Sequence, residues 1–349
     1  MRRALQLAAL AEGMTSPNPM VGAVVLSARG LLVGEGFHAK AGEPHAEVGA
    51  LAQAGPRANG GTLIVTLEPC CHHGRTPPCA EAVVAAGIAR VVIALEDPDP
   101  RVAGGGITRL KQAGLEVIAG VLREEAQQQN RHFLHRIRSG RPWGLLKWAM
   151  SLDGRTALPN GSSQWISGSV ARQWVHQLRA QCDAVIVGGG TVRADDPLLT
   201  SRGRRTPEPL RVVLSRSLDL PDSARLWDES VAPTLVVHGP EACDQALPEG
   251  PERLLLDVCD PLHLMQALAA RGCNRVLWEC GPELAAAAMR QGCIQEIAAV
   301  LAPKLMGGCP ARTPLGDLGF SGMAQVINLS HVQQCSLGPD WLIQGRSDG

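Results

Sequence analysis

Short apolar runs rich in β-branched residues alternate with segments of helical spacing along the first part of the chain. Such runs, bounded by Gly, Pro or polar residues, predict strands at 21–26, 31–37, 62–67, 90–95 and 115–118. Helical spacing between them predicts helices at 45–54, 78–87 and 106–113. The turn at 28–30 joins the first two strands into a hairpin. This order predicts an α/β domain of three layers, α/β/α, with one sheet between two layers of helices.

The charged, Gln-rich stretch at 122–138 is predicted to be helical, and Gly140 followed by Pro142 predicts where it ends. We place a domain boundary there. Beyond it, the pattern predicts a second α/β sheet, with strands at 145–149, 184–187, 211–214, 234–237, 253–256, 275–278 and 296–301. Helices are predicted at 169–180, 261–270 and 282–290, and the last strands flank Ser336 and Trp341. A chain of 349 residues therefore predicts two domains, 1–140 and 141–349.

Charge and hydropathy exclude two classes of partner. The 33 basic and 33 acidic residues balance, and no run of Lys or Arg forms a basic stripe, so we expect no nucleic-acid partner. Apolar residues make up 45% of the chain, but Gly and Pro break them into runs too short for a membrane span. The basic and apolar start resembles a signal peptide, but Glu12 and Gly13 follow at once, so an amphipathic first helix is expected.

Eleven cysteines are spread over the whole chain. Two of them belong to the metal motif described next, and the spacing of the others does not suggest a disulfide framework. We expect free thiols in a reducing cytosol, and hence a cytoplasmic protein, at Cys182, Cys243, Cys259, Cys273, Cys280, Cys293, Cys309 and Cys335.

A Cys/His motif carries the clearest chemistry. The stretch E-P-C-C-H-H-G-R-T-P-P-C at 68–79 follows the triplet H-A-E at 45–47. Zinc prefers thiolate and imidazole ligands, and a catalytic zinc takes three protein ligands and keeps one position for water. His45, Cys70 and Cys79 are such a set. Glu47 occupies the place, two residues after the histidine, where zinc deaminases have the carboxylate that transfers protons.

A structural zinc site is the alternative. Cysteines and histidines more often close a four-ligand site than an open one, and Cys71, His72 and His73 are spare ligands. The combination of H-x-E with P-C and a later cysteine favours the catalytic interpretation, because it matches the deaminase signature. The usual signature has two residues between its cysteines, whereas here eight residues separate Cys70 from Cys79. The longer loop would bring polar groups toward a substrate.

Two Gly-rich turns in the second half suggest a phosphate-bearing cofactor. Residues 185–191 and 281–285 each run from a predicted strand into a helix, where free N–H groups can bind phosphate oxygens. Neither has the G-x-G-x-x-G pattern, so a Rossmann domain is not supported, and each turn alone is equally consistent with a plain tight turn.

In the first half, Asn18 stands between two prolines that hold its backbone extended.

These motifs together resemble the bifunctional deaminase–reductase family of riboflavin biosynthesis. The resemblance rests on T-S-P-N-P-M-V-G-A-V at 15–24, the two metal motifs, L-K-W-A-M-S-L-D-G-R-T-A at 146–157 and W-E-C-G-P-E-L at 278–284. It implies a cytidine-deaminase-like domain followed by a dihydrofolate-reductase-like domain, with Zn²⁺ and NADPH as cofactors. The implied reactions are deamination of 2,5-diamino-6-(5-phosphoribosylamino)pyrimidin-4-one and then reduction of its ribosyl group to a ribityl chain. We also expect a homo-oligomer.

The resemblance also implies roles for individual residues. In the deaminase half it places Asn18 and His38 at the substrate. In the reductase half the implied NADPH-binding residues are Ala149, Trp165, Thr191, Asp195, Ser215, Gly281, Pro282, Glu283, Leu284 and Ala285. The implied substrate-binding residues are Ser163, Arg179, Leu199, Arg202 and Glu279, and Lys147 is a further candidate for a polar group of the sugar. Asp195 and Glu279 are both candidates for proton transfer in the reduction.

Two other functions remain open at this point. The first is a nucleoside or tRNA deaminase fused to an unrelated domain, which the long cysteine spacing and the lack of a basic surface argue against. The second is a protein with a structural zinc that binds nucleotides as a sensor. Turnover of tRNA or cytidine would test the first alternative. Glu47 tests the second, because a catalytic site requires its carboxylate and a sensor does not.

Overall fold

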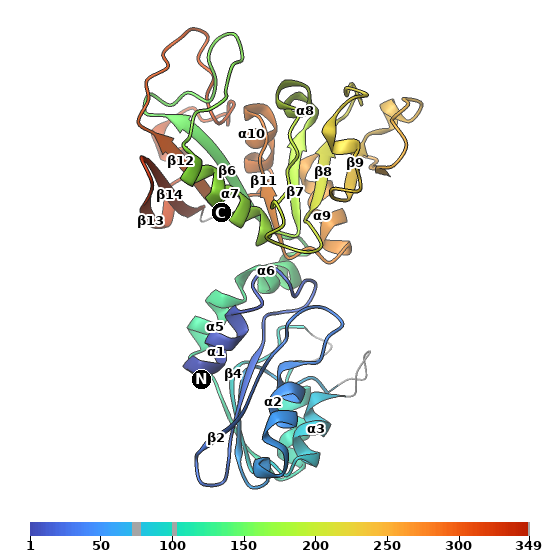
Figure 1. Cartoon of the computed structure of the whole chain (residues 1–349), viewed down its shortest axis with the longest axis vertical. Coiled ribbons are helices and arrows are strands. Elements are labelled where there is room, and N and C mark those ends of the chain that lie inside the picture. Colours follow the sequence, from blue (N-terminus) through green and yellow to red (C-terminus); the bar gives the residue numbers. More distant parts are fainter. Residues whose placement is uncertain (72–77, 100–102, 348–349) are drawn as a thin grey trace. The chain divides into compact units, whose positions relative to one another are not determined.

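The computed structural model describes residues 1–71, 78–99 and 103–347. The chain divides into two compact units, Met1–Gly140 and Arg141–Gly349, each with its own sheet (Figure 1). Each unit is described by itself.

The first unit is built on a sheet of five strands in the order β2-β1-β3-β4-β5. Its strands are β1 Gly22–Leu26, β2 Leu32–Phe37, β3 Thr62–Leu67, β4 Arg90–Leu95 and β5 Glu116–Ala119. The β1–β2 hairpin and the β1–β3 pair are antiparallel, whereas β3, β4 and β5 run parallel. The predicted strands and hairpin are confirmed.

Helices cover both faces of this sheet (Figure 1). On one face, α2 Ala46–Ala54, α3 Cys79–Ala85 and α4 Gly105–Gln112 pack on Ala23, Val25 and other strand residues. On the other face lie α1 Arg2–Ala9, α5 Arg123–Gln129 and α6 Arg131–Ser139. The three-layer α/β/α prediction is therefore confirmed. The α2 helix lies so close to β2 that a Cβ on Gly36 would be 2.3 Å from Ala46 O, so only glycine fits there.

The helical stretch predicted at 122–138 is confirmed, but it is divided into two helices, α5 and α6, that meet at Asn130. The Asn130 side chain accepts a hydrogen bond from Met20 N and donates one to Met20 O, at 2.8 and 2.9 Å. This buried amide serves the loop before β1, and its backbone leaves the helical region at φ −97° and ψ 16°. A tertiary contact thus overrides the helical spacing.

The second unit has a nine-stranded sheet in the order β10-β9-β8-β7-β11-β6-β12-β14-β13. The strands are β6 Trp143–Ser151, β7 Ala184–Gly188, β8 Leu210–Leu214, β9 Thr234–His238, β10 Glu252–Leu255, β11 Arg275–Trp278, β12 Glu296–Ala302, β13 Leu329–Leu337 and β14 Asp340–Ser347. The strands from β10 to β12 in this order are parallel, and β14 and β13 add an antiparallel edge. The predicted second α/β sheet is confirmed.

Helices also cover both faces of the second sheet. The α7 helix Ser169–Ala180 and the α8 helix Gly189–Asp195 pack on one face, and α9 Pro261–Ala270 and α10 Pro282–Arg290 pack on the other. Short 3-10 helices lie at η1 Gly55–Ala58, η2 Arg225–Trp227, η3 Pro240–Ala242 and η4 Met323–Gln325. None of the helices in the described part of the chain combines the length and apolar character needed to cross a bilayer.

Candidate active sites

Three metal-ligand side chains meet beside the sheet of the first unit. His45 is the residue before α2, Cys70 follows β3, and Cys79 is the first residue of α3. Their ligand atoms all lie within 4.8 Å of one another. His45 Nδ1 is 3.1 Å from Cys79 Sγ and 3.7 Å from Cys70 Sγ. One imidazole and two thiols are the donor set that zinc prefers, so these residues fit a zinc ion.

The electrostatics of this cluster favour a thiolate. Hydrogen bonds from Cys79 and His45 lower the pKa of Cys70 to about 4. The same hydrogen bond and burial raise the pKa of Cys79. His45 and Cys79 stand at helix N-termini, whose dipoles favour negative charge on a ligand. A dipositive ion would replace the remaining protons.

The spare ligands of the structural-zinc alternative differ in what the structure says of them. Cys71 is not part of the described cluster, and its Sγ lies against α4, 2.6 Å from where a Cβ on Gly105 would be. His72 and His73 fall outside the described residues, as do Arg75 and Thr76 of the same loop. Among the described residues, the site therefore has three protein ligands, as a catalytic zinc requires.

Glu47 lies in the first turn of α2 and is 3% exposed. Burial raises the pKa of its carboxyl group to about 7, against the opposing effects of the His45 charge and a hydrogen bond with Cys79. A group with a pKa near neutrality can both accept and release a proton at physiological pH. The predicted acid–base residue is thus beside the metal ligands.

Asn18 and His38 form a hydrogen-bonded pair next to this cluster. His38 Nδ1 is 3.2 Å from Pro44 O, so this nitrogen donates its proton to the carbonyl. His38 Nε2 then accepts a hydrogen bond from Asn18 Nδ2 at 3.0 Å. Burial lowers the pKa of His38, which keeps the ring neutral, and its edge packs on His45 with ring centroids 5.5 Å apart. Both residues predicted at the substrate are therefore adjacent to the metal site.

Glu68 is a residue of this site to which the sequence analysis assigned no role. Its buried carboxylate accepts backbone hydrogen bonds from Asp97, Gly104 and Ile107, at 3.1, 3.1 and 3.0 Å. It ties the segment after β4 and the start of α4 to the end of β3, one residue before Pro69 and two before Cys70. A buried carboxylate needs hydrogen-bond partners. The acidic residue of the E-P-C motif could therefore have indicated a carboxylate that holds neighbouring backbone segments.

This packing makes a prediction at α4. A Cβ on Gly106 would lie 2.0 Å from Pro69 O, so the Gly106→Ala variant has to displace the backbone that carries Cys70. We expect a loss of about 1 to 3 kcal/mol in the unfolding free energy, as for other overpacked sites, and zinc affinity at least about tenfold lower. Thermal denaturation and a competitive zinc titration measure the two effects.

Gly105→Ala is the matched control on the same helix. Among the described residues, its Cβ would meet only the Cys71 side chain, whose Sγ can rotate away, so stability and zinc affinity should stay near those of the unmodified protein. Equal behaviour of the two variants would contradict the role of the Pro69 contact.

In the second unit, charged side chains cluster at the carboxyl end of β11. Glu279 follows this strand, and its carboxylate accepts hydrogen bonds from Arg179 Nε at 2.6 Å and Nη2 at 3.1 Å. Lys147 Nζ from β6 lies 3.7 Å from the same carboxylate. Burial would raise the pKa of Glu279, but the charges of Arg179 and Lys147 outweigh it and lower the pKa to about 2. Three residues predicted at the substrate thus form one buried ionic cluster.

The two Gly-rich turns lie side by side, as a bound dinucleotide phosphate requires. A Cβ on Gly281 would be 4.0 Å from Thr191 Oγ1 of the first turn. A Cβ on Gly188 would be 3.2 Å from Leu284 Cδ2 of the second. A Cβ on Gly189 would be 3.0 Å from Ser215 Oγ, so a side chain there would crowd the end of β8. Both turns stand at the carboxyl ends of parallel strands, β7 and β11, where open α/β sheets bind dinucleotides, so their position fits NADPH.

The first turn of α10 has two N–H donors for a phosphate. Pro282 has no N–H, and Ala285 already donates its N–H to Gly281 O at 3.0 Å. The N–H groups of Glu283 and Leu284 are the remaining donors of this turn. The Ala285 side chain is fully buried, so its predicted cofactor contact is limited to packing beneath the turn.

The other predicted residues of the second unit lie partly on loops and partly on β6 and α8. Ser163 Oγ donates a hydrogen bond to Asp195 Oδ1 at 3.3 Å, which joins the loop after β6 to the end of α8. Ala149 lies on β6, on the face that α7 and α8 cover. Leu199 is 2% exposed and Arg202 is exposed, and both have left-handed backbones at φ 54° and 55°.

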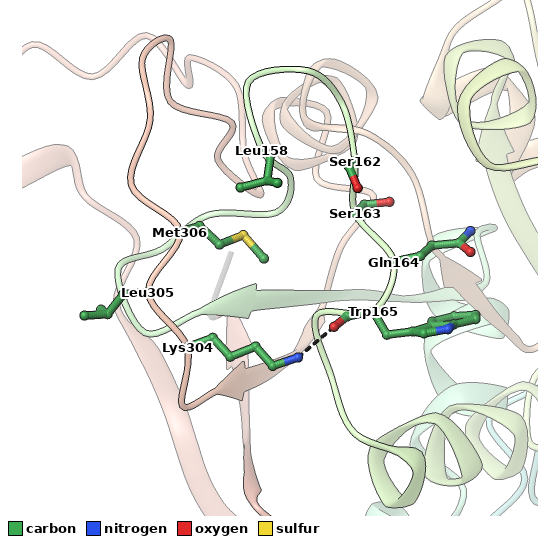
Figure 2. A pocket seen from close by; sticks show the side chains of 8 residues that line it. All are labelled: Leu158, Ser162, Ser163, Gln164, Trp165, Lys304, Leu305 and Met306. Carbon is green, nitrogen blue, oxygen red and sulfur yellow. Dashed lines mark hydrogen bonds between the residues drawn. The ribbon is translucent and has the colours of Figure 1, made fainter.

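Trp165 and Ser163 line a cavity of about 410 Å³ together with residues for which the sequence predicted no role. Figure 2 shows it between the loop after β6 and the loop after β12, with Leu158 and Met306 on facing segments. Lys304 Nζ donates a hydrogen bond to Trp165 O at 2.7 Å across these loops. Asp153 holds the second loop by accepting hydrogen bonds from Met306 N and Gly307 N. Only tertiary contacts bring these loops together, so spacing could not reveal them.

Comparison with known proteins agrees with these two sites. Residues 1–95 match the family model of the cytidine and deoxycytidylate deaminase zinc-binding region. Residues 142–343 match the family model of the RibD C-terminal domain. The metal ligands and Glu47 fall within the first match, and the Glu279 cluster falls within the second.

Full-length relatives contain both parts. The chain is 52% identical to the riboflavin biosynthesis protein RibD of Synechocystis over 350 residues, covering 99% of this chain and 95% of the relative. The corresponding protein of Escherichia coli is 43% identical over 371 residues, with 97% and 96% covered. The structure of Acinetobacter baumannii RibD superposes with a TM-score of 0.90 at 39% identity, covering 100% of this chain and 98% of that one. A Thermotoga maritima structure described as a diaminohydroxyphosphoribosylaminopyrimidine deaminase/5-amino-6-(5-phosphoribosylamino)uracil reductase has a TM-score of 0.87 at 34% identity, covering 99% and 97%.

The chain therefore belongs to the RibD family, and it is a bifunctional enzyme of riboflavin biosynthesis that joins a zinc-binding deaminase to an NADPH-dependent reductase.

Proposed function

We propose that this chain converts 2,5-diamino-6-(5-phosphoribosylamino)pyrimidin-4-one in two consecutive steps. Residues 1–140 replace the amino group on C2 by oxygen, and residues 141–349 then reduce the ribosyl group to a ribityl chain. The observation that carries this proposal is the pairing, in one chain, of two clusters. Among the described residues, three metal-ligand side chains lie beside Glu47, and a buried cationic cluster surrounds Glu279.

In the first step, Glu47 is the group that moves protons. His45, Cys70 and Cys79 would hold a zinc ion, which would supply the Lewis acidity that activates a water molecule. Glu47 accepts a proton from this water, passes it to a ring nitrogen and delivers the next one to the departing amine. The C–N bond breaks, a carbonyl forms and ammonia leaves. The Asn18 amide and the neutral His38 ring orient the pyrimidine.

In the second step, the chain binds and orients the two reactants. A bound NADPH would supply the hydride for C1 of the ribose, and the ring oxygen would take up a proton as the C1–O bond opens. The turns at Gly188 and Gly281 hold the cofactor phosphates, with Ser215 at the adenosine end. Lys147 and Glu279 contact the sugar, and Arg179 and Arg202 bind its phosphate. Asp195 is the candidate proton donor, because the pKa of Glu279 is lowered to about 2 and its carboxylate holds no proton at neutral pH.

The same proposal includes a homo-oligomer in the cytoplasm. Free thiols at all eleven cysteines support a reducing compartment. Exposed apolar side chains near the edge strand β13 support a contact with a second copy, namely Met323, Val332 and Trp341. Light scattering of the purified protein measures its mass in solution.

Removing the metal tests the division of labour. With the diaminopyrimidinone, zinc and NADPH, the protein should release ammonia and then oxidise NADPH. After chelation, ammonia release should stop, while NADPH oxidation on the separately supplied deaminated pyrimidine should continue at its former rate, because the Glu279 cluster uses no metal ligand. Restored ammonia release on adding zinc completes the experiment. Parallel loss of both activities would contradict the assignment of one reaction to each unit.

A further inference from the structure

The loop between α8 and β8 has an unusual backbone. Leu199, Arg202 and Gly203 have φ values of 54°, 55° and 73°. A left-handed backbone at a residue with a side chain costs of order 1 kcal/mol or more, and it persists only where surrounding contacts impose it. Arg202 is the exposed residue of this set that carries a charge, so the imposed backbone decides where a guanidinium group projects.

Glu208 supplies the contacts that impose this backbone. Its two carboxylate oxygens accept hydrogen bonds from Ser201 N at 2.6 Å and from Gly203 N at 2.8 Å. These N–H groups lie on either side of Arg202. Hydrogen bonds to an ionised acceptor are about twice as strong as neutral ones. The fully buried Ser201 adds a further link, because its Oγ accepts a hydrogen bond from Arg205 N at 3.2 Å.

The loop is also fixed to α7, where two other basic residues lie. Thr200 O accepts a hydrogen bond from Arg179 Nη1 at 3.1 Å and lies 3.3 Å from His176 Nδ1. Arg179 is the residue that pairs with Glu279. The turn around Arg202 is therefore built onto the ionic cluster of the reductase site.

Positive charge gathers at this place. Burial lowers the pKa of His176, and the charges of three arginines lower it further. These are Arg179, Arg202 and Arg204, of which the last two are exposed. Arg204 also donates a hydrogen bond to Ser201 O at 3.4 Å, so it belongs to the same turn. Two exposed guanidinium groups on one turn suit a phosphate dianion.

We propose that Glu208 is a positioning residue of the reductase, which holds Arg202 and Arg204 in place to bind the phosphate of the substrate. Glu208 itself bonds backbone N–H groups and acts on the substrate only through the turn. This inference rests on the proposed function for the phosphate contact of Arg202, and it adds Glu208 and Arg204 to that site.

Ribose 5-phosphate is a probe for this site alone. In the full-length protein, we expect Glu208→Ala to raise the Kd for ribose 5-phosphate about tenfold, and to raise KM in the reduction by a similar factor with little change in kcat, because a lost charge-assisted contact has about this effect. The Kd for NADPH should stay unchanged. Titration calorimetry and steady-state kinetics measure these values. Glu208→Gln keeps the shape and one acceptor oxygen, so it should have a smaller effect, and it serves in place of the alanine variant should that one fail to fold.

Glu229→Ala is the matched control. The Glu229 carboxylate likewise accepts a backbone hydrogen bond, from Thr234 N at 3.3 Å, in another loop of the same unit. Equal losses in the Glu208 and Glu229 variants would indicate general destabilisation and overturn the proposal. The double variant Glu208→Ala/Arg202→Ala should bind ribose 5-phosphate no more weakly than Arg202→Ala, because both changes remove the same contact; additive losses would also overturn it.

Arg202→Ala separates this inference from the proposed function. If it weakens ribose 5-phosphate binding and the Glu208 variants do not, the positioning role fails and the phosphate site stands. If Arg202→Ala leaves the binding of ribose 5-phosphate unchanged, the proposed phosphate contact itself is wrong.

Discussion

The Glu47→Gln variant should release ammonia at least about a hundredfold more slowly than the unmodified protein, because general acid–base catalysis contributes about 10² to 10⁴ in rate. Glutamine has nearly the same shape, so the helix start that carries His45 should be preserved. It cannot take up a proton, however, and so removes the group whose pKa burial raises to about 7. Ammonia release from the diaminopyrimidinone, measured together with zinc content, gives the result.

Zinc binding and reduction are the controls for this variant. The zinc content should stay near one ion per protein chain, because Glu47 is not among the three metal-ligand residues. NADPH oxidation with the deaminated pyrimidine should also be unchanged. A variant that loses zinc as well would point to a structural role for the carboxylate, and a variant that still deaminates would exclude Glu47 as the proton carrier.

The Glu279→Gln variant should lose most of the reductase activity and destabilise the second unit by about 3 to 5 kcal/mol, as when one partner of a buried ion pair is removed. Arg179 and Lys147 would keep their charges at a site where the three side chains are 11 to 14% exposed. The second unit would be less stable because the two positive charges would repel each other and Arg179 would lose its charge-assisted hydrogen bonds to the carboxylate. Denaturant unfolding and NADPH oxidation are the measurements, and unchanged ammonia release is the control.

The same carboxyl group makes stability depend on pH. The pKa of Glu279 is lowered to about 2 in the folded chain, whereas an unfolded Glu has a pKa of about 4.3. The folded state therefore binds fewer protons, so this contribution is complete above about pH 4.3 and is lost as the pH falls toward 2. In Glu279→Gln the unfolding free energy of the second unit should fall less steeply over this range. An identical pH dependence in both proteins would show that the Glu279 carboxylate has no stabilising partner.

Local patterns in the sequence were enough to predict the two layered α/β units. They were also enough to select His45, Cys70 and Cys79 as candidate metal ligands and Glu47 as the candidate acid–base residue. Each of these depends on local spacing. Alternating apolar runs and helical periodicity specify elements, because the pattern of burial repeats with the geometry of the strand or helix. His45 and Glu47 are two residues apart, and Cys70 and Cys79 stand where a strand ends and a helix begins, so a short motif already places them together.

Contacts between residues that are far apart in the chain depend on tertiary packing and could not be predicted from local patterns. Glu279 and Arg179 are 100 positions apart and form a buried pair because β11 and α7 pack on one sheet. Asn130 divides a helical stretch because its amide bonds Met20, 110 positions away. Glu68 and Glu208 hold loops through backbone N–H groups, which leave no pattern of side chains in the sequence. Buried polar groups must find partners wherever the folded chain brings them, and neither periodicity nor motif spacing encodes that choice.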